Sequence, residues 1–229
     1  MTFYEFSEED FTAVEFHNNI NPRLRIEPKY FNLGFSPVPK IYGRSAVLKQ
    51  LLVALDNLPA NYGFLIWDVY RPRAVQGALF NWMQEQLRSQ YPHLCDEAIC
   101  VEAKKYMSPP AKIGDSYCSP HLSGGAIDLT LFHIHEGKEV DMGTIFDDCT
   151  YKAHRHYYDL KNDLLPEEIS IKHSRDLLRT AMEQTGFTSY EYEWWHYDLG
   201  NLFWSERVQK PAVFGPLFGD LEWPEGEIH

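Results

Sequence analysis

Two segments of the chain carry side chains of the kinds that bind metal ions in proteins. Residues 119–128 read SPHLSGGAID and contain His121 and Asp128, and residues 193–196 read EWWH and end in His196. Zinc accepts imidazole nitrogen and carboxylate oxygen atoms, and a catalytic zinc site leaves one of its four positions open for water. His121, Asp128 and His196 would fill the other three positions, so these segments predict a catalytic zinc site.

Two further side chains suit the hydrolysis of an amide at such a metal. Glu193 is not needed as a ligand, so its carboxylate could take a proton from the bound water. Arg71 directly follows an apolar run, residues 62–69, that can hold it rigidly. Its guanidinium stays charged at any working pH and could stabilise the negative charge that forms on oxygen when an amide carbonyl is attacked.

Two other histidine pairs are alternative metal sites. His133 and His135, and likewise His154 and His156, would each place two imidazoles on one face of a strand. Neither pair has a Gly-rich segment beside it or a separate free glutamate. A lone histidine, moreover, is more often a structural residue than a ligand. We therefore expect the principal site at the first two segments.

The residues around these segments predict both helices and strands. Apolar residues at helical spacing predict helices over residues 45–58, 74–87, 96–106 and 170–185. Apolar or alternating runs predict strands over residues 62–69, 126–132 and 187–197, with a hairpin turn at 136–138. The order lacks regular βαβ spacing, which favours an α+β fold. We expect a mixed or antiparallel sheet with helices packed around it and the zinc site in a central cleft.

The spacing of Glu193 and His196 constrains the strand that carries them. Side chains three residues apart in a regular strand point to opposite faces of the sheet. Glu193 and His196 can serve one metal only if the strand is irregular or begins between them. The sequence therefore predicts such an irregularity.

Length and composition narrow the function further. The chain has 229 residues, of which 44% are hydrophobic and 15% aromatic, so we expect one folded domain rather than a disordered chain. The net charge of −12 argues against nucleic acid and anionic membrane surfaces as partners. No signal-peptide pattern or apolar span is visible, so we expect a cytoplasmic protein. The four cysteines are too irregularly spaced for a disulfide framework, so we expect free thiols.

The motifs together resemble the VanX-type D-alanyl-D-alanine dipeptidases, a family of zinc D,D-peptidases. The family patterns SxHxxGxAxD and ExWH match residues 119–128 and 193–196, and the patterns YRP and MGTxFD match residues 70–72 and 142–147. The resemblance runs from about Arg25 to Phe218. It implies one domain over residues 1–229, with residues 1–24 as an N-terminal extension and residues 205–229 as a C-terminal tail.

The resemblance also implies a role for each matched residue. One Zn²⁺ would be held by His121, Asp128 and His196. Glu193 would act as general base and then as general acid on the zinc-bound water and the leaving amine, and Arg71 would stabilise the tetrahedral intermediate. Ser119 and Asp147 match the positions that hold the free amino group of the substrate. The implied reaction is hydrolysis of the small dipeptide D-alanyl-D-alanine to two D-alanines.

One segment departs from the family, and two other functions stay open. Family members carry a YAT…NF stretch where residues 24–32 here read LRIEPKYFN, so Tyr30 is not assigned to the site. One alternative is a D,D-carboxypeptidase or endopeptidase that acts on peptidoglycan peptides. The other is a non-catalytic, zinc-stabilised binding module, which the presence of both Glu193 and Arg71 disfavours. The sequence leaves the oligomeric state open.

Overall fold

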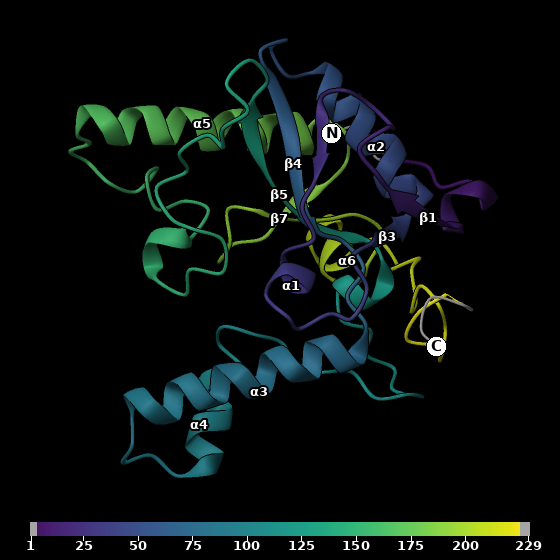
Figure 1. Ribbon diagram of the computed structural model, residues 1–229, viewed down its shortest axis with the longest axis vertical. Helices are drawn as coiled ribbons and strands as arrows, with labels where there is room; N and C mark the ends of the chain where they lie inside the picture. The colour runs from purple at the N-terminus through teal and green to yellow at the C-terminus, as the bar shows by residue number, and fades with distance from the viewer. Residues whose placement is uncertain (1–3, 225–229) are drawn as a thin grey trace.

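A five-stranded mixed sheet forms the centre of the protein, which a computed structural model describes over residues 4–224 (Figure 1). In spatial order its strands are β2 (Leu24–Ile26), β4 (Tyr62–Asp68), β5 (Ala126–His133), β7 (His196–Asp198) and β6 (Thr188–Ser189). The β2–β4 pair is parallel, and the other pairs are antiparallel. A second, two-stranded antiparallel sheet joins β1 (Ala13–Phe16) to β3 (Ile41–Arg44).

Six α-helices surround these sheets. They are α1 (Lys29–Asn32), α2 (Ser45–Asp56), α3 (Arg73–Gln90), α4 (Asp96–Ala103), α5 (Pro166–Glu183) and α6 (Leu202–Val208). Helix α2 packs against β1, β3 and α5, and α5 also packs against β5 and β6. Helices α3 and α4 lie together on the opposite side of the molecule from α5 (Figure 1).

The apolar core has a main part around the five-stranded sheet, a second part that packs the start of α3 against β3 and Tyr70, and a third part between α3 and α4. Leu51 and Leu55 of α2 pack with Phe64 and Ile66 of β4 and with Leu131 of β5. Burying such a side chain contributes roughly 1.5–3 kcal/mol, which offsets the entropy lost when the chain is ordered. The α3–α4 core is small and consists of Phe80, Met83, Leu87, Ile99 and Ala103.

The α+β class and most of the predicted elements are confirmed. Helices α2, α3, α4 and α5 and strands β4 and β5 lie within four residues of the predicted bounds. The predicted hairpin is reduced to one bridge between Phe132 and Glu139. All four cysteines are free thiols, as expected. Strands β1, β2 and β3 were not predicted, because three or four residues are too few for a periodic signal.

The predicted strand over residues 187–197 is wrong, whereas the predicted irregularity within it is confirmed. The segment forms two short strands, β6 and β7, separated by a turn, and β7 begins at His196. The backbone N–H of Trp194 donates to the carbonyl of Ala153, and the Trp194 indole N–H donates to Thr144. Because these bonds go to the 3₁₀ helix Tyr151–Ala153 and to Thr144 instead of a neighbouring strand, the chain turns before His196.

Both ends of the described chain pack against the body of the fold. Phe16 and Leu24 belong to the main core, and Phe214 joins them from the other end of the chain. The Tyr70 hydroxyl donates to the carbonyl of Glu222. The described residues therefore form a single domain, and residues 1–3 and 225–229 lie outside them. Within residues 4–224, no helix combines the length and the apolar character that a membrane span needs.

Two adjacent glycines permit the close approach of chain segments beside β5. Gly124 has φ +68°, in the left-handed region that favours glycine, and ends the short 3₁₀ turn His121–Ser123. A Cβ atom on Gly125 would lie 2.5 Å from the backbone carbonyl oxygen of Leu199. Backbone cannot yield as a flexible side chain can, so this position requires glycine.

We expect Gly125→Ala to lower the free energy of unfolding by roughly 1–3 kcal/mol, because the added methyl group overpacks a fixed backbone contact. Chemical denaturation of the two proteins measures this difference. Gly215→Ala is the control, since a Cβ there meets nothing within 4 Å. Equal unfolding free energies for Gly125→Ala and the wild type would contradict the packing argument.

Candidate active site

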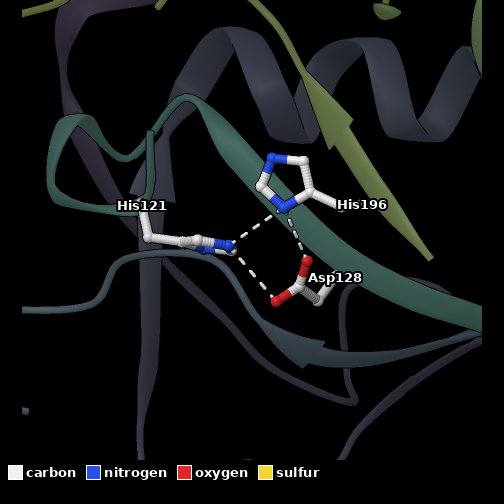
Figure 2. Close-up of side chains that lie close together, drawn as sticks. All are labelled: His121, Asp128 and His196. Carbon is white, nitrogen blue, oxygen red and sulfur yellow. Dashed lines mark hydrogen bonds and ion pairs between the residues drawn. The ribbon is translucent and has the colours of Figure 1, made fainter. Parts of the chain in front are cut away.

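Three buried side chains point toward one another beside the inner strands β5 and β7 of the sheet (Figure 2). The Nε2 atom of His121 lies 3.2 Å from Nδ1 of His196 and 3.2 Å from Oδ2 of Asp128. The Nδ1 atom of His196 lies 3.0 Å from Oδ1 of Asp128. Ligands bound at about 2.0–2.1 Å in a tetrahedron are about 3.3 Å apart, so the donor atoms of these three side chains are spaced as metal ligands are. This group could hold a metal ion.

The sheet brings these side chains together from distant parts of the chain. Asp128 on β5 pairs directly with His196 on β7, and Asp68 at the end of β4 pairs with Asp128 across an irregularity in the ladder. Directly paired residues on neighbouring strands have Cβ atoms about 4.5–5.5 Å apart, close enough to share one ion. His121 comes from the 3₁₀ turn that precedes β5.

Hydrogen bonds to the outer ring nitrogens orient both histidines. Nδ1 of His121 lies 2.8 Å from the carbonyl oxygen of Val69, and Nε2 of His196 lies 3.0 Å from Oδ1 of Asp198. An acceptor at one ring nitrogen places the proton there and leaves the other nitrogen free to bind a metal. Asp198 also accepts a hydrogen bond from Asn201. Asp198 was not predicted, although its alternation with His196 along one strand face was a signal for it.

The charges of this group link metal binding to pH. Burial alone would lower the pKa of His196, but Asp198 and Asp128 raise it well above its usual value. Burial alone would raise the pKa of Asp128, but His121 and His196 lower it. His196 therefore carries a proton when no metal is bound, and metal binding must displace that proton. We expect the affinity for the metal to fall as the pH falls.

We expect Asp198→Asn to weaken metal binding by roughly 10–100-fold, because an amide holds the His196 ring less firmly and lowers its basicity. Titration with Zn²⁺ against a competing chelator measures the affinity. Asp163→Asn, at an exposed position, is the matched control. An unchanged affinity for Zn²⁺ in Asp198→Asn would show that the Asp198 carboxylate does not influence metal binding by His196.

The guanidinium of Arg71 lies beside His121, Asp128 and His196, here called the three-donor group. It is held on several sides. Its Nε donates to Asp68 at 2.8 Å, its Nη2 to Asp128 at 3.2 Å and its Nη1 to Gln76 at 3.0 Å. The ring of Tyr30 lies 4.4 Å from its central carbon. Burial alone would lower the pKa of Arg71, but the phenol and the two carboxylates raise it. Arg71 is therefore a fixed cation.

The carboxylate of Glu193 faces the same group from the turn before β7. Its Oε2 lies 3.8 Å from Nδ1 of His196, and 27% of its side chain is exposed. The surrounding protein raises the pKa of Glu193 to about 8, through burial first and then through the charges of Asp128 and Asp147. A carboxylate with this pKa can both accept and return a proton near neutral pH.

Asp147 and Tyr30 form a second polar pair near Arg71. The Tyr30 hydroxyl donates to Oδ2 of Asp147 at 3.0 Å. Asp147 has φ +60°, and burial raises its pKa to about 7. The sequence did not assign Tyr30 to the site, because only the fold brings α1 beside this loop.

All of the predicted site residues line one pocket of about 260 Å³. They are Arg71, Ser119, His121, Asp128, Asp147, Glu193 and His196, and Tyr30 and Gln76 line the same pocket. A fixed cation, a half-buried carboxylate and a metal-binding group therefore face one space, an arrangement suited to hydrolysis of a polarised carbonyl.

Neither alternative histidine pair forms a comparable group within the described chain. The ring of His133 packs on Tyr62 with centroids 5.0 Å apart, and Nδ1 of His156 lies 2.9 Å from Asp159. His154 lines the pocket, but within residues 4–224 neither pair belongs to a group of three side chains that could hold a metal ion.

Comparison with known proteins agrees with the geometry of the site. The family model described as D-ala-D-ala dipeptidase matches residues 35–213. The D-alanyl-D-alanine dipeptidase of Enterococcus faecalis is 33% identical over 168 residues, covering 71% of this chain and 75% of the relative. Those of Enterococcus faecium and Escherichia coli are 32% and 27% identical, covering 71% and 79% of this chain and 75% and 81% of the relatives. The chain therefore belongs to the D-Ala-D-Ala dipeptidase family of metallopeptidases.

Proposed function

We propose that the protein is a zinc-dependent dipeptidase that hydrolyses D-alanyl-D-alanine to two D-alanines in the cytoplasm. The observation that carries the proposal is that the three-donor group, Glu193 and Arg71 face one pocket in a member of this family. Residues 1–229 would act as one catalytic domain, with residues 1–24 as its N-terminal extension and 205–229 as its C-terminal tail.

His121, Asp128 and His196 would hold the metal. Two imidazole nitrogens and one carboxylate oxygen form a ligand set that suits zinc and leaves a fourth position open. A bound zinc ion would supply a Lewis acid that polarises the scissile carbonyl and lowers the pKa of water.

The proton transfers would belong to Glu193. Its carboxylate would accept a proton from the attacking water and then deliver that proton to the nitrogen of the leaving amine. Burial raises the pKa of this carboxyl, which favours its uptake of the proton, and a zinc ion beside it would lower that pKa again.

Arg71 would stabilise the oxyanion that forms as the carbonyl is attacked. Three of the five N–H donors of a guanidinium are used by Asp68, Asp128 and Gln76, which leaves two for the substrate. Because the cation is fixed before the substrate binds, little reorganisation accompanies the reaction.

Asp147, with Ser119 and Tyr30, would bind the free amino group of the dipeptide. The buried carboxyl of Asp147 has a pKa of about 7, and a substrate ammonium beside it would lower that pKa and keep the group ionised. An internal peptide segment has no such ammonium. The ion pair between Asp147 and the substrate ammonium would therefore select a peptide with a free N-terminus at this position.

We expect Asp147→Asn to lower kcat/KM for D-alanyl-D-alanine by roughly 10–100-fold, because a charge-assisted hydrogen bond worth about 1.5–3 kcal/mol is lost. Steady-state kinetics measure this effect. Asp148→Asn is the neighbouring control, since Asp148 also lines the pocket but accepts a hydrogen bond from Thr150. Equal losses in the two variants would contradict a specific role for Asp147.

The deciding experiment measures total free alanine, of either configuration, released by the purified, zinc-loaded protein from D-alanyl-D-alanine, L-alanyl-L-alanine and a muropeptide that ends in D-Ala-D-Ala. Turnover of the free D,D-dipeptide alone would support the proposal. Release from the muropeptide but not from the dipeptide would instead indicate a D,D-carboxypeptidase. Zinc binding without release from any substrate would indicate a binding module.

A further inference from the structure

Gln76 lies behind Arg71 in the wall of the pocket and uses both ends of its side-chain amide. Its Oε1 accepts a hydrogen bond from Nη1 of Arg71 at 3.0 Å, and its Nε2 donates to the backbone carbonyl of Ser108 at 2.7 Å. The side chain is buried. A guanidinium only donates and a carbonyl only accepts, so one orientation of the amide satisfies both partners.

These two bonds connect different parts of the fold. Arg71 is bound on its other sides by Asp68 and Asp128, which come from β4 and β5 of the sheet. Ser108 belongs to the segment 104–108 after α4, which lines the same pocket. Helix α3 shares a small core with α4, and its first turns pack through Val75 and Leu79 against Tyr70, so apolar packing already attaches this wall to the rest of the fold. Gln76 therefore ties the arginine to the helical wall as well as to the sheet.

Because Gln76 is neutral, it holds Arg71 without adding a further negative charge beside the guanidinium. Asp68 and Asp128 already place two carboxylates against the guanidinium. A third carboxylate at Gln76 would weaken the attraction of Arg71 for an oxyanion, whereas an amide oxygen orients Nη1 without adding charge. An apolar side chain would leave Nη1 without its acceptor, and the guanidinium could then turn about its bonds to the two aspartates.

We propose that Gln76 is a positioning residue that fixes the orientation of the Arg71 guanidinium and couples it to the pocket wall at Ser108. The inference rests on the proposed role of Arg71 in the hydrolysis of D-alanyl-D-alanine. It assigns Gln76 no contact with the substrate, so its effect must pass through Arg71.

The test measures kcat and KM for D-alanyl-D-alanine in Gln76→Met, in Arg71→Ala and in the double variant. We expect Gln76→Met to lower kcat by about tenfold or more, because a small misplacement of a catalytic group can cost up to about 100-fold. Its KM and its zinc content should stay close to those of the wild type. In the Arg71→Ala background the same change should have no further effect on kcat. Gln86→Met, at an exposed position of α3, is the matched control.

The outcomes distinguish a failure of the role proposed for Gln76 from a failure of the role proposed for Arg71. A normal kcat in Gln76→Met, or a kcat loss that is equally large with and without Arg71, overturns the inference alone. A normal kcat in Arg71→Ala overturns the proposed role of Arg71 and the inference with it. If Gln76→Met does not fold, Gln76→Glu takes its place in the same comparison. It retains an acceptor for Arg71 but cannot donate to Ser108, and its kcat loss should likewise vanish in the Arg71→Ala background.

Discussion

Glu193→Gln should lower kcat for D-alanyl-D-alanine by a factor on the order of 10²–10⁴ while the protein keeps its zinc. Glutamine has nearly the same shape as glutamate but cannot accept the proton of the attacking water. The Glu193 carboxylate lies 3.8 Å from Nδ1 of His196 and is not part of the group that could hold the metal. Its loss should therefore remove the proton transfer and leave the ligands in place.

The measurement is steady-state D-alanine release together with the zinc content of the same preparation. Glu191→Gln is the neighbouring control, because Glu191 is exposed and pairs with Arg207 at the surface. Loss of zinc from Glu193→Gln would place Glu193 among the metal ligands. Retained zinc with near-normal turnover would assign the base to another residue.

His121→Ala should lose the metal, the turnover and the stabilisation that the metal provides. A ligand that binds only the folded state stabilises it by about 4 kcal/mol when its free concentration is about 1,000 times Kd. The wild type should therefore unfold at a higher temperature when zinc is added. His121→Ala should show no such rise, because two remaining ligands bind zinc much more weakly.

The readouts are zinc content and the melting temperature with and without added zinc. His135→Ala is the control, and it also tests the alternative pair of His133 and His135. If His135→Ala loses zinc and His121→Ala keeps it, the metal site lies at the alternative pair. Together with Glu193→Gln, these variants distinguish a ligand from a base, because only the loss of a ligand should remove the metal.

The parts of the fold that the sequence predicted correctly depend on local patterns. Helix α2 places Val47, Leu51 and Leu55 at helical spacing, and all three side chains are buried. Such patterns predict structure because each residue is buried according to its own position along the element. The predicted strand over residues 187–197 failed because the Trp194 backbone bonds to Ala153, the last residue of a 3₁₀ helix that lies far earlier in the chain.

The sequence by itself determined which residues could do chemistry, because metal ligands, a general base and a cation have distinctive side chains and lie in short motifs. Only the tertiary structure decided which other side chains form hydrogen bonds to these residues and hold them in position. Tyr30, Gln76 and Asp198 belong to no predicted motif, and each acts on a residue that it meets through the fold: Asp147, Arg71 and His196 respectively. A phenol, an amide or a second carboxylate is common at any position, so it acquires a role only when the sheet and the α3–α4 wall place it within hydrogen-bond distance of the site.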